Sequence, residues 1–205
     1  SVPVGEYLKG KIFYGIKTGF NEAFVIDKET KNRLIKEDNK SKEIIKPFLA
    51  GRDIKRYKKP ESDKYLIFTK RGIDIEHYPA VKRHLEQYKK QLMPKPKEFK
   101  GDKWEGRKTG NYKWYEIQDA VDYYAEFEKP KIIIPAIVKS ASYCWDENKF
   151  YSNDKTSIIQ TEDKYLLGIL NSSACDFYLK SIAATKRGGY FEYKPMYVSK
   201  LPVPK

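Results

Sequence analysis

The distribution of hydrophobic residues along the chain predicts both strands and helices. Within residues 11–27, two short aromatic and β-branched runs surround Gly15 and Gly19, which is typical of a strand, a glycine turn and a second strand. This segment therefore predicts a β-hairpin. Three later apolar stretches predict buried strands. These stretches are Tyr65–Thr69, Lys131–Pro135 and Ser157–Thr161.

Helical patterns occur in three other segments. Ser41–Leu49 predicts a short helix, because its apolar residues can share one face. From Pro79 onward, apolar residues recur at intervals of four, three and four, and proline suits the first turn of such a helix. A further helix over Asp163 to about Ala183 has a broad apolar face that includes Phe177 and Tyr178, and this width predicts deep burial.

The order of these elements predicts an α+β fold with a mixed, largely antiparallel sheet and a few packed helices, because strands and helices do not alternate regularly. A length of 205 residues fits one large domain better than several small ones, so we expect a single domain over residues 1–205. The chain begins without an initiator methionine and ends in Leu201-Pro-Val-Pro-Lys205, which we interpret as the linkers of a domain excised from a larger chain.

Charge and cysteine content narrow the classes of partner and compartment. Lysine and arginine number 41 and aspartate and glutamate 28, a formal net charge of +13 that favours polyanions or anionic membrane surfaces. Cys144 and Cys175 form no CxxC motif and are interpreted as inert packed thiols, which suits a reducing cytoplasm. The longest apolar run, Ile132–Val138, is too short to span a bilayer, and no signal-peptide pattern opens the chain. We therefore expect a cytoplasmic protein without membrane insertion.

No sequence pattern predicts a catalytic residue, a metal site or a cofactor site. The chain contains neither a GxG nor a Pro-Pro dipeptide, so the cofactor loop and target-amine motif of a methyltransferase are both missing. Gly101–Thr109 imitates a phosphate-binding loop, but Arg107 stands where that motif requires lysine. His77 and His84 are the only histidines, have no further ligands at zinc spacing, and are expected at the surface.

The remaining chemistry is positive charge interleaved with aromatic and amide groups, a combination typical of nucleic-acid binding. Basic clusters occur over Arg52–Lys59, over Lys186–Tyr193 and within residues 89–113, where nine Lys or Arg against three acidic residues predict a long exposed loop. The predicted phosphate contacts are Lys17, Arg52, Lys55, Arg56, Lys100 and Lys103. The predicted base contacts are Asn21, Arg107, Lys108, Lys186 and Arg187. The predicted turn residues are Gly15, Gly19, Gly51, Gly188 and Gly189. For each cluster, the alternative is a solvated surface or a turn that binds no ligand.

Several sequence blocks resemble one known family. Tyr14-Gly-Ile-Lys-Thr-Gly-Phe-Asn-Glu-Ala-Phe24 and Phe48-Leu-Ala-Gly-Arg-Asp-Ile-Lys-Arg-Tyr57 are similar to blocks of the TaqI-like C-terminal specificity domain. The later blocks that continue the resemblance in order are Tyr65–Thr69, Tyr78–Ala80, Trp114–Glu116, Phe127–Ile132, Leu167–Asn171, Arg187–Phe191 and Leu201-Pro202.

This resemblance implies a target recognition domain fused behind an adenine-specific DNA methyltransferase, often within a combined restriction and modification polypeptide. Such a domain faces the methyltransferase domain across a DNA cleft and helps to present a flipped adenine. The resemblance implies S-adenosylmethionine as cofactor of the parent chain, with none bound by this fragment, and it accounts for the absence of catalytic motifs.

We therefore predict a fragment that is not itself an enzyme, and that binds duplex DNA and sets the target site of an adenine-N6 methyltransferase, whose parent chain is a candidate endonuclease as well. Its expected partners are duplex DNA and the N-terminal methyltransferase domain of the same parent chain. Three alternatives stay open. They are an RNA-binding module that stacks bases on its 17 tyrosines, a basic protein-docking module, and a stand-alone metal-dependent nuclease that uses Asp102 or Glu98.

Overall fold

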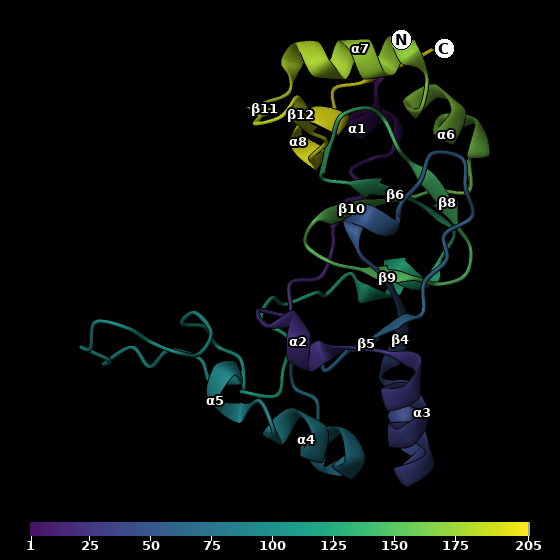
Figure 1. Ribbon diagram of the computed structural model, residues 1–205. Helices are drawn as coiled ribbons and strands as arrows, with labels where there is room; N and C mark the ends of the chain where they lie inside the picture. The colour runs from purple at the N-terminus through teal and green to yellow at the C-terminus, as the bar shows by residue number, and fades with distance from the viewer. Residues whose placement is uncertain (205) are drawn as a thin grey trace. The chain divides into compact units, whose positions relative to one another are not determined.

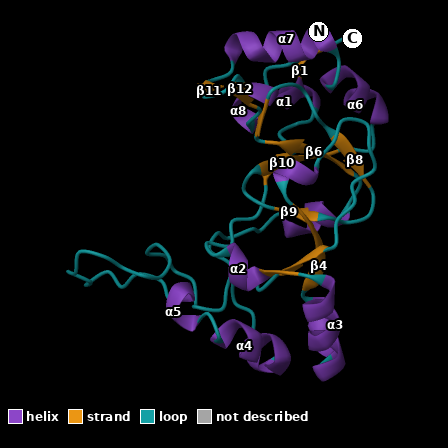
Figure 2. Ribbon diagram, viewed as in Figure 1, coloured by secondary structure: helices purple, strands orange, loops and turns teal. Residues whose placement is uncertain are grey.

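The computed structural model describes residues 1–204, which form two compact units (Figures 1 and 2). Unit 1 comprises Ser1–Gly15, Leu49–Ser62 and Tyr123–Lys205, and unit 2 comprises Ile16–Phe48 and Asp63–Asp122. The chain passes between the units more than once, so neither unit is one continuous stretch of sequence. The largely antiparallel α+β class predicted from the sequence is confirmed.

The core of unit 1 is a four-stranded sheet in the order β2, β10, β6, β8. Its strands are β2 (Ile12–Tyr14), β10 (Thr156–Gln160), β6 (Lys131–Pro135) and β8 (Cys144–Asp146). Every neighbouring pair is antiparallel. All five residues of β6 are buried, as expected for a central strand read from a continuous apolar run. The predicted strands at Lys131–Pro135 and Ser157–Thr161 are thereby confirmed.

Short helices and strands complete unit 1. The helices are α1 (Val4–Tyr7), α6 (Lys164–Leu170), α7 (Ser173–Ile182) and α8 (Pro195–Val198), with the 3₁₀ turns η2 (Gly51–Asp53) and η4 (Tyr124–Glu128). The strands are β1 (Val2–Pro3), β7 (Ile137–Val138), β9 (Tyr151–Ser152), β11 (Thr185–Lys186), β12 (Tyr190–Glu192) and β13 (Pro202–Val203). β1 pairs with β13, so the two ends of the described chain lie side by side (Figure 1).

Unit 2 contains a smaller antiparallel sheet, in which β5 lies between β3 and β4. Its strands are β3 (Val25–Ile26), β4 (Ile45–Leu49, of which Leu49 belongs to unit 1) and β5 (Lys64–Ile67). Its helices are α2 (Asn21–Phe24), α3 (Lys28–Glu37), α4 (Pro79–Glu86) and α5 (Lys89–Leu92), with the 3₁₀ turns η1 (Asn39–Glu43) and η3 (Ile75–His77). β5 and α4 confirm two predictions, and proline does occupy the first turn of α4. Figure 2 shows that the chain after α5 is mainly loop.

The predicted N-terminal hairpin is wrong. β2 ends at Tyr14 and pairs with β10 instead of with the next segment of chain, which becomes α2 and β3. Gly15 lies so close to unit 1 backbone that an added Cβ would stand 1.8 Å from the carbonyl oxygen of Asn153. The first run was read correctly as extended, but most of the second run forms α2 and only Val25–Ile26 is a strand. The alternation of side chains also does not say which strand is the partner of β2.

Two helix predictions also need correction. Residues 41–49 form the end of η1 and then β4, because Pro47 cannot continue a helix and the β-branched Ile44 and Ile45 favour extended backbone. The long helix over residues 163–183 is in fact α6 and α7, separated where the Ser172 hydroxyl accepts a hydrogen bond from the Cys175 amide at 3.2 Å and caps α7.

The expectation that this second helix is deeply buried is wrong for its outer face. Phe177 is 78% exposed and Tyr178 43% exposed, whereas Cys175 and Leu179 on the opposite face join the core. α7 packs on α6, α8 and the core through one face only, so the breadth of its apolar surface overstates its burial. No helix among residues 1–204 is both long and apolar enough to cross a membrane.

Candidate nucleic-acid interface

Arg107 belongs to the basic loop of unit 2, but its side chain is buried in the interior of that unit. The side chain was predicted to read bases, yet the residue is only 3% exposed. Its guanidinium donates hydrogen bonds to five backbone carbonyls. The acceptors are Leu92 at 2.8 Å, Thr18 at 2.8 Å, Glu116 at 2.7 Å, Trp114 at 2.9 Å and Lys113 at 3.3 Å. A guanidinium has five N–H donors, so none is left for a base edge, and the base contact predicted for Arg107 is withdrawn.

The charge of Arg107 persists despite this burial. Burial lowers the pKa of the guanidinium from its ordinary value to about 10, which still leaves it protonated at neutral pH. The rings of Tyr112 and Phe24 lie 4.4 and 5.6 Å from the guanidinium carbon. The five carbonyl acceptors compensate the buried positive charge, and the guanidinium in turn links the segments that carry them. We use the term Arg107 hub for the guanidinium and these five carbonyls.

The Arg107 hub joins three segments that are distant in sequence: the turn at Lys17–Asn21, the chain after α5, and residues 113–119. Backbone hydrogen bonds reinforce the same connections, since Gln118 donates to the Thr18 carbonyl and Asp119 to the Lys17 carbonyl, both at 3.2 Å. At Gly19, φ is +84° and an added Cβ would lie 2.6 Å from Cδ of Arg107. This turn therefore requires glycine both for its backbone conformation and for its packing.

A buried carboxylate stabilises the same loop. Glu116 accepts hydrogen bonds from the amides of Gly72 and Lys113, both at 2.9 Å, and lies 3.7 Å from the guanidinium of Arg71. Glu116 and Arg71 were not among the residues predicted from the sequence. The only signal available was the acidic residue within the block Trp114–Glu116, and charge alone does not distinguish a buried acceptor from a surface one.

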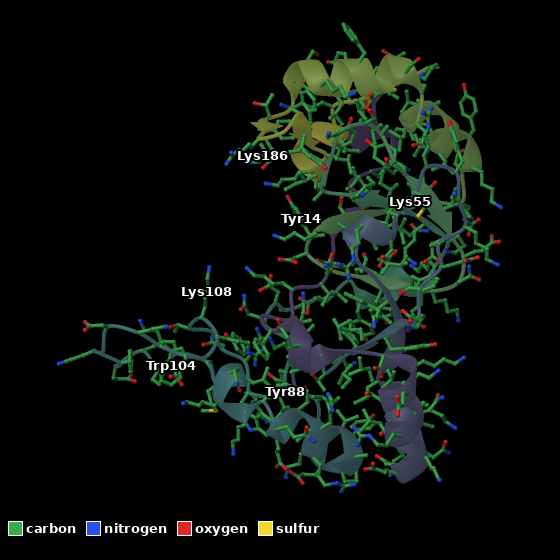
Figure 3. The ribbon with its side chains drawn as sticks, in the orientation of Figure 1. Tyr14, Lys55, Tyr88, Trp104, Lys108 and Lys186 are labelled. Carbon is green, nitrogen blue, oxygen red and sulfur yellow. The ribbon has the colours of Figure 1, made fainter. Side chains whose placement is uncertain are left out.

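Around the Arg107 hub, several predicted contact residues remain at the surface. Lys100, Lys103, Lys108 and Asn21 are exposed, and Lys17 is half-buried. Figure 3 shows the Lys108 side chain pointing away from the loop that carries it. Asn21 accepts a hydrogen bond from the Thr18 hydroxyl at 2.7 Å through its side-chain oxygen, which leaves its two N–H donors without a partner within the described chain. Unit 2 thus presents amines and an amide from loops that are fixed from within.

The cluster Arg52–Lys59 in unit 1 divides into anchored and exposed residues. Asp53 accepts a hydrogen bond from the amide of Ala50 at 2.8 Å, and Arg56 donates to the carbonyl of Asn171. Part of the Arg56 guanidinium is therefore bonded within the protein, although the residue is still exposed. Arg52 and Lys55 are exposed and remain open to solvent. Gly51 precedes them at a close approach, 3.0 Å between an added Cβ and the Lys155 carbonyl oxygen.

The turn between β11 and β12 carries the last predicted cluster. Gly188 and Gly189 have φ values of +80° and +76°, the left-handed region that favours glycine. Lys186 forms an ion pair with Glu192 at 2.9 Å, and this hydrogen bond raises the pKa of the lysine. Arg187 is exposed and has no partner among residues 1–204. Of these two cations, Arg187 is therefore the one whose donors are free for a ligand.

The histidines and cysteines of the described chain lie only partly where the sequence predicted them. No group of three or more His, Cys, Asp or Glu there could hold a metal ion. His77 is exposed as expected, but the prediction for His84 is wrong, because it is buried with Nε2 3.1 Å from the Ala23 carbonyl oxygen. Burial raises the pKa of the Cys144 thiol to about 12, and Cys175 is also buried. Both are packed thiols, as predicted.

Comparisons with known proteins agree with this scaffold. The family model of the TaqI-like C-terminal specificity domain matches residues 46–203. The type II methyltransferase M.XhoI of Xanthomonas vasicola is 22% identical over 135 residues, which cover 64% of this chain and 23% of that protein. The type IIL restriction-modification enzyme MmeI, solved in complex with DNA, has a TM-score of 0.62 and 15% identity over 98% of this chain and 24% of MmeI.

The chain thus spans about a quarter of the length of each of these two proteins. The structural similarity supports the fold, and the family model covers most of the sequence, including the loop that the Arg107 hub organises. The chain therefore belongs to the family of TaqI-like C-terminal specificity domains.

Proposed function

We propose that this chain binds duplex DNA and selects the sequence at which an adenine-N6 DNA methyltransferase acts. The main observation behind the proposal is the Arg107 hub, in which a buried cation fixes a loop whose other cations are exposed. A loop that reads a DNA sequence must hold its side chains in register with the bases, and internal anchoring gives that rigidity before DNA arrives.

The proposal assigns separate roles to the exposed residues. In unit 2, Lys100, Lys103 and Lys17 contact phosphates, whereas Lys108 and Asn21 approach base edges. The side chain of Asn21 has two amide N–H donors without a partner and a free acceptor lone pair, which suits the edge of adenine. The amine of Lys108 suits the edge of guanine. In unit 1, Arg52 and Lys55 contact phosphates, and Arg187 is the strongest candidate for a guanine contact. Arg56 and Lys186 contribute less, because intramolecular partners already occupy them.

The proposed parent protein extends beyond this chain. Its methyltransferase domain would bind S-adenosylmethionine and carry the chemistry, and this chain would act as its specificity domain in the cytoplasm. An endonuclease activity in the same polypeptide also belongs to this proposal. This chain's own part is to bind DNA, to orient it and to exclude sequences whose base edges leave its polar groups unpaired.

The test is enrichment of random duplex DNA by the 205-residue chain at low and at physiological salt. A short motif that survives the higher salt establishes sequence readout, because counterion-driven binding weakens steeply with salt. Equal competition by duplex RNA, or loss of all enrichment at the higher salt, contradicts the proposal for this chain. An RNA preference would support the tyrosine-stacking alternative instead.

Single substitutions then separate the roles. Arg187→Ala should relax specificity at one position and cost about 1 to 3 kcal/mol of binding free energy at the preferred site. Lys103→Ala should weaken binding to all sequences alike and reduce the salt slope by about 0.9. Lys36→Ala, an exposed lysine of α3, is the matched control and should change neither. If Arg187→Ala weakens all sequences equally, Arg187 contacts phosphate and its base-reading role fails.

A further inference from the structure

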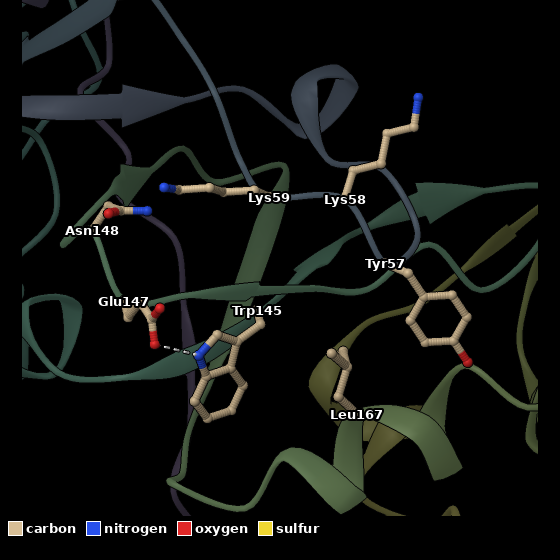
Figure 4. Close-up of a pocket in the computed structure, with 7 residues that line it drawn as sticks. All are labelled: Tyr57, Lys58, Lys59, Trp145, Glu147, Asn148 and Leu167. Atoms are coloured by element: carbon tan, nitrogen blue, oxygen red, sulfur yellow. Dashed lines mark hydrogen bonds between the residues drawn. The ribbon is translucent and has the colours of Figure 1, made fainter.

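Unit 1 contains a pocket that the duplex-binding proposal does not use. Its volume is about 300 Å³. The lining residues are Tyr57, Lys58, Lys59, Trp145, Glu147, Asn148 and Leu167 (Figure 4). This volume is at the lower end of small-ligand sites, so the pocket has room for a single small molecule or for one residue of a polymer.

One side of the pocket is apolar and aromatic. Figure 4 shows Leu167 between the rings of Tyr57 and Trp145. Trp145 lies in β8, and its indole N–H donates to Glu147 at 3.2 Å, which fixes the orientation of the ring. Leu167 belongs to α6. Two elements of the core thus support this side, which suits a flat ring better than a branched aliphatic group.

The other side of the pocket carries polar side chains that have no partner in the described chain. The amines of Lys58 and Lys59 form no hydrogen bond or ion pair within residues 1–204, and neither does the side-chain amide of Asn148. In Figure 4, Lys59 extends towards Asn148. Glu147 is compensated, because it accepts from Trp145 and lies 3.7 Å from the Lys164 amine. The unpaired charge at the rim is therefore that of the two lysine amines, which favours an anion.

The loop that brings Tyr57 to this pocket is strained and anchored. Tyr57 has φ of +57°, a left-handed conformation that is rare for a bulky residue, and it is nevertheless 59% exposed. Its amide donates to the Tyr143 carbonyl at 3.4 Å, and Arg56 next to it is held by Asn171. Strain of this kind persists where surrounding contacts impose it, and it concentrates at ligand clamps. The ring lies 5.1 Å from the guanidinium carbon of Arg56 and otherwise stays largely open to solvent at the pocket.

We propose that this pocket binds one unpaired nucleotide, with the base against Tyr57, Trp145 and Leu167 and the phosphate on Lys58 and Lys59. A flat base and an adjacent phosphate match the two sides of the pocket, and stacking on aromatic rings tolerates any base. The Asn148 amide lies where it can pair with a base edge. A base inside a duplex cannot enter, so the ligand is either an extrahelical residue of a DNA strand or a free nucleotide.

The test titrates the 205-residue chain with dAMP and with deoxyadenosine, by calorimetry. It also compares a fully paired duplex with the same duplex that carries one bulged nucleotide. Tyr57→Gly removes the ring at a position whose backbone favours glycine, so this variant should fold. Tyr165→Ala is the matched control, since Tyr165 is a tyrosine of unit 1 that is 66% exposed and lies outside the pocket.

We expect wild type and Tyr165→Ala to bind dAMP, and Tyr57→Gly to bind it about 5- to 150-fold more weakly, which corresponds to the loss of one stacking contact. Lys59→Gln should weaken dAMP but leave deoxyadenosine unchanged. A preference for the bulged duplex that dAMP competes away identifies a DNA residue as the ligand, and dAMP binding without such a preference identifies a free nucleotide.

The proposal is overturned if wild type binds neither dAMP nor the bulged residue, or if Tyr57→Gly binds as tightly as Tyr165→Ala. Affinity for the fully paired duplex is a separate readout, which Tyr57→Gly should leave unchanged. Failure of the pocket and failure of duplex binding are thereby told apart, because each experiment can fail while the other succeeds.

Discussion

Replacement of Arg107 tests whether this residue is a hub or a base reader. Arg107→Met keeps a long apolar stem but removes all five guanidinium donors. The carbonyls of Lys113 and Trp114 are only partly buried and can recruit water, and the Thr18 carbonyl keeps the amide of Gln118. Leu92 and Glu116 then account for the main loss, because their interior carbonyls no longer receive a hydrogen bond from this side chain.

The magnitude follows from these two acceptors. An unsatisfied buried acceptor costs about 1 to 3 kcal/mol, so two of them cost about 2 to 6 kcal/mol. Methionine offsets part of this cost, because no charge is then held in the interior. We expect the free energy of unfolding of unit 2 to fall by about 3 kcal/mol. Arg107→Lys should recover only part of the loss, since an ammonium has three donors and cannot reach the carbonyls as a planar fork does.

Urea denaturation followed by tryptophan fluorescence measures this change, with Trp104 and Trp114 as reporters inside unit 2. Hydrogen exchange gives the local signature, because the amides of Lys95, Gln118 and Asp119 bond across the loop and should lose protection. DNA affinity should fall for every sequence, as the loop loses its shape. If Arg107→Met keeps the wild-type urea midpoint and weakens only sequences with one particular base, Arg107 reads DNA and the hub interpretation is refuted.

Three further predictions follow from the packing. Gly19→Ala should destabilise unit 2 by about 2 kcal/mol or more in urea denaturation, because φ is +84° and the added methyl meets Arg107; unchanged stability would contradict this. Burial lowers the pKa of His84, so the unfolded chain binds a proton at a higher pH than the folded chain, and the free energy of unfolding should fall as pH drops below 6.5. In His84→Gln this part of the pH dependence should disappear. A dependence of stability on pH equal to that of wild type would contradict the prediction. Lys131→Met should cost about 3 to 5 kcal/mol, since it leaves Asp146 buried without its 2.5 Å partner, and a thermal midpoint near that of wild type would show that the pair is dispensable.

The sequence predicted those elements whose signal is local. β6 contains the apolar run Ile132–Ile134, and a strand buried on both faces has that pattern, whereas β10 was predicted from the shorter pair Ile158 and Ile159. α4 combines helical spacing with proline in its first turn. The hairpin prediction failed because the partner of β2 is β10, which lies far along the chain, and the spacing of side chains carries no information on that choice.

The site was harder to predict, because its main anchor bonds to backbone. Arg107 pairs with carbonyls from the Thr18 turn, the end of α5 and the segment at Lys113–Glu116. Every residue has a carbonyl, so no residue type marks these acceptors in a sequence. Arg107 consequently resembled its exposed neighbour Lys108, although one is buried and the other is open to solvent. Charge content predicted a basic loop correctly but did not separate its anchor from its surface.

The residues that fix backbone and the exposed cations have different roles in this chain. Gly19, Arg56 and Glu116 fix backbone from within family blocks, since Gly19 packs on the hub, Arg56 bonds to Asn171 and Glu116 accepts from two amides, and Arg107 does so from between blocks. Lys103 and Lys108 lie between blocks, and their exposed side chains make no such contact in the described chain. A substitution of one of these anchors should therefore act through stability and affect every DNA sequence, whereas a substitution of an exposed cation should act on affinity or preference with the fold intact. A change of target sequence is accordingly more accessible at exposed positions such as Lys103, Lys108 and Arg187 than at the anchors, since those side chains can vary without leaving a buried polar group unpaired.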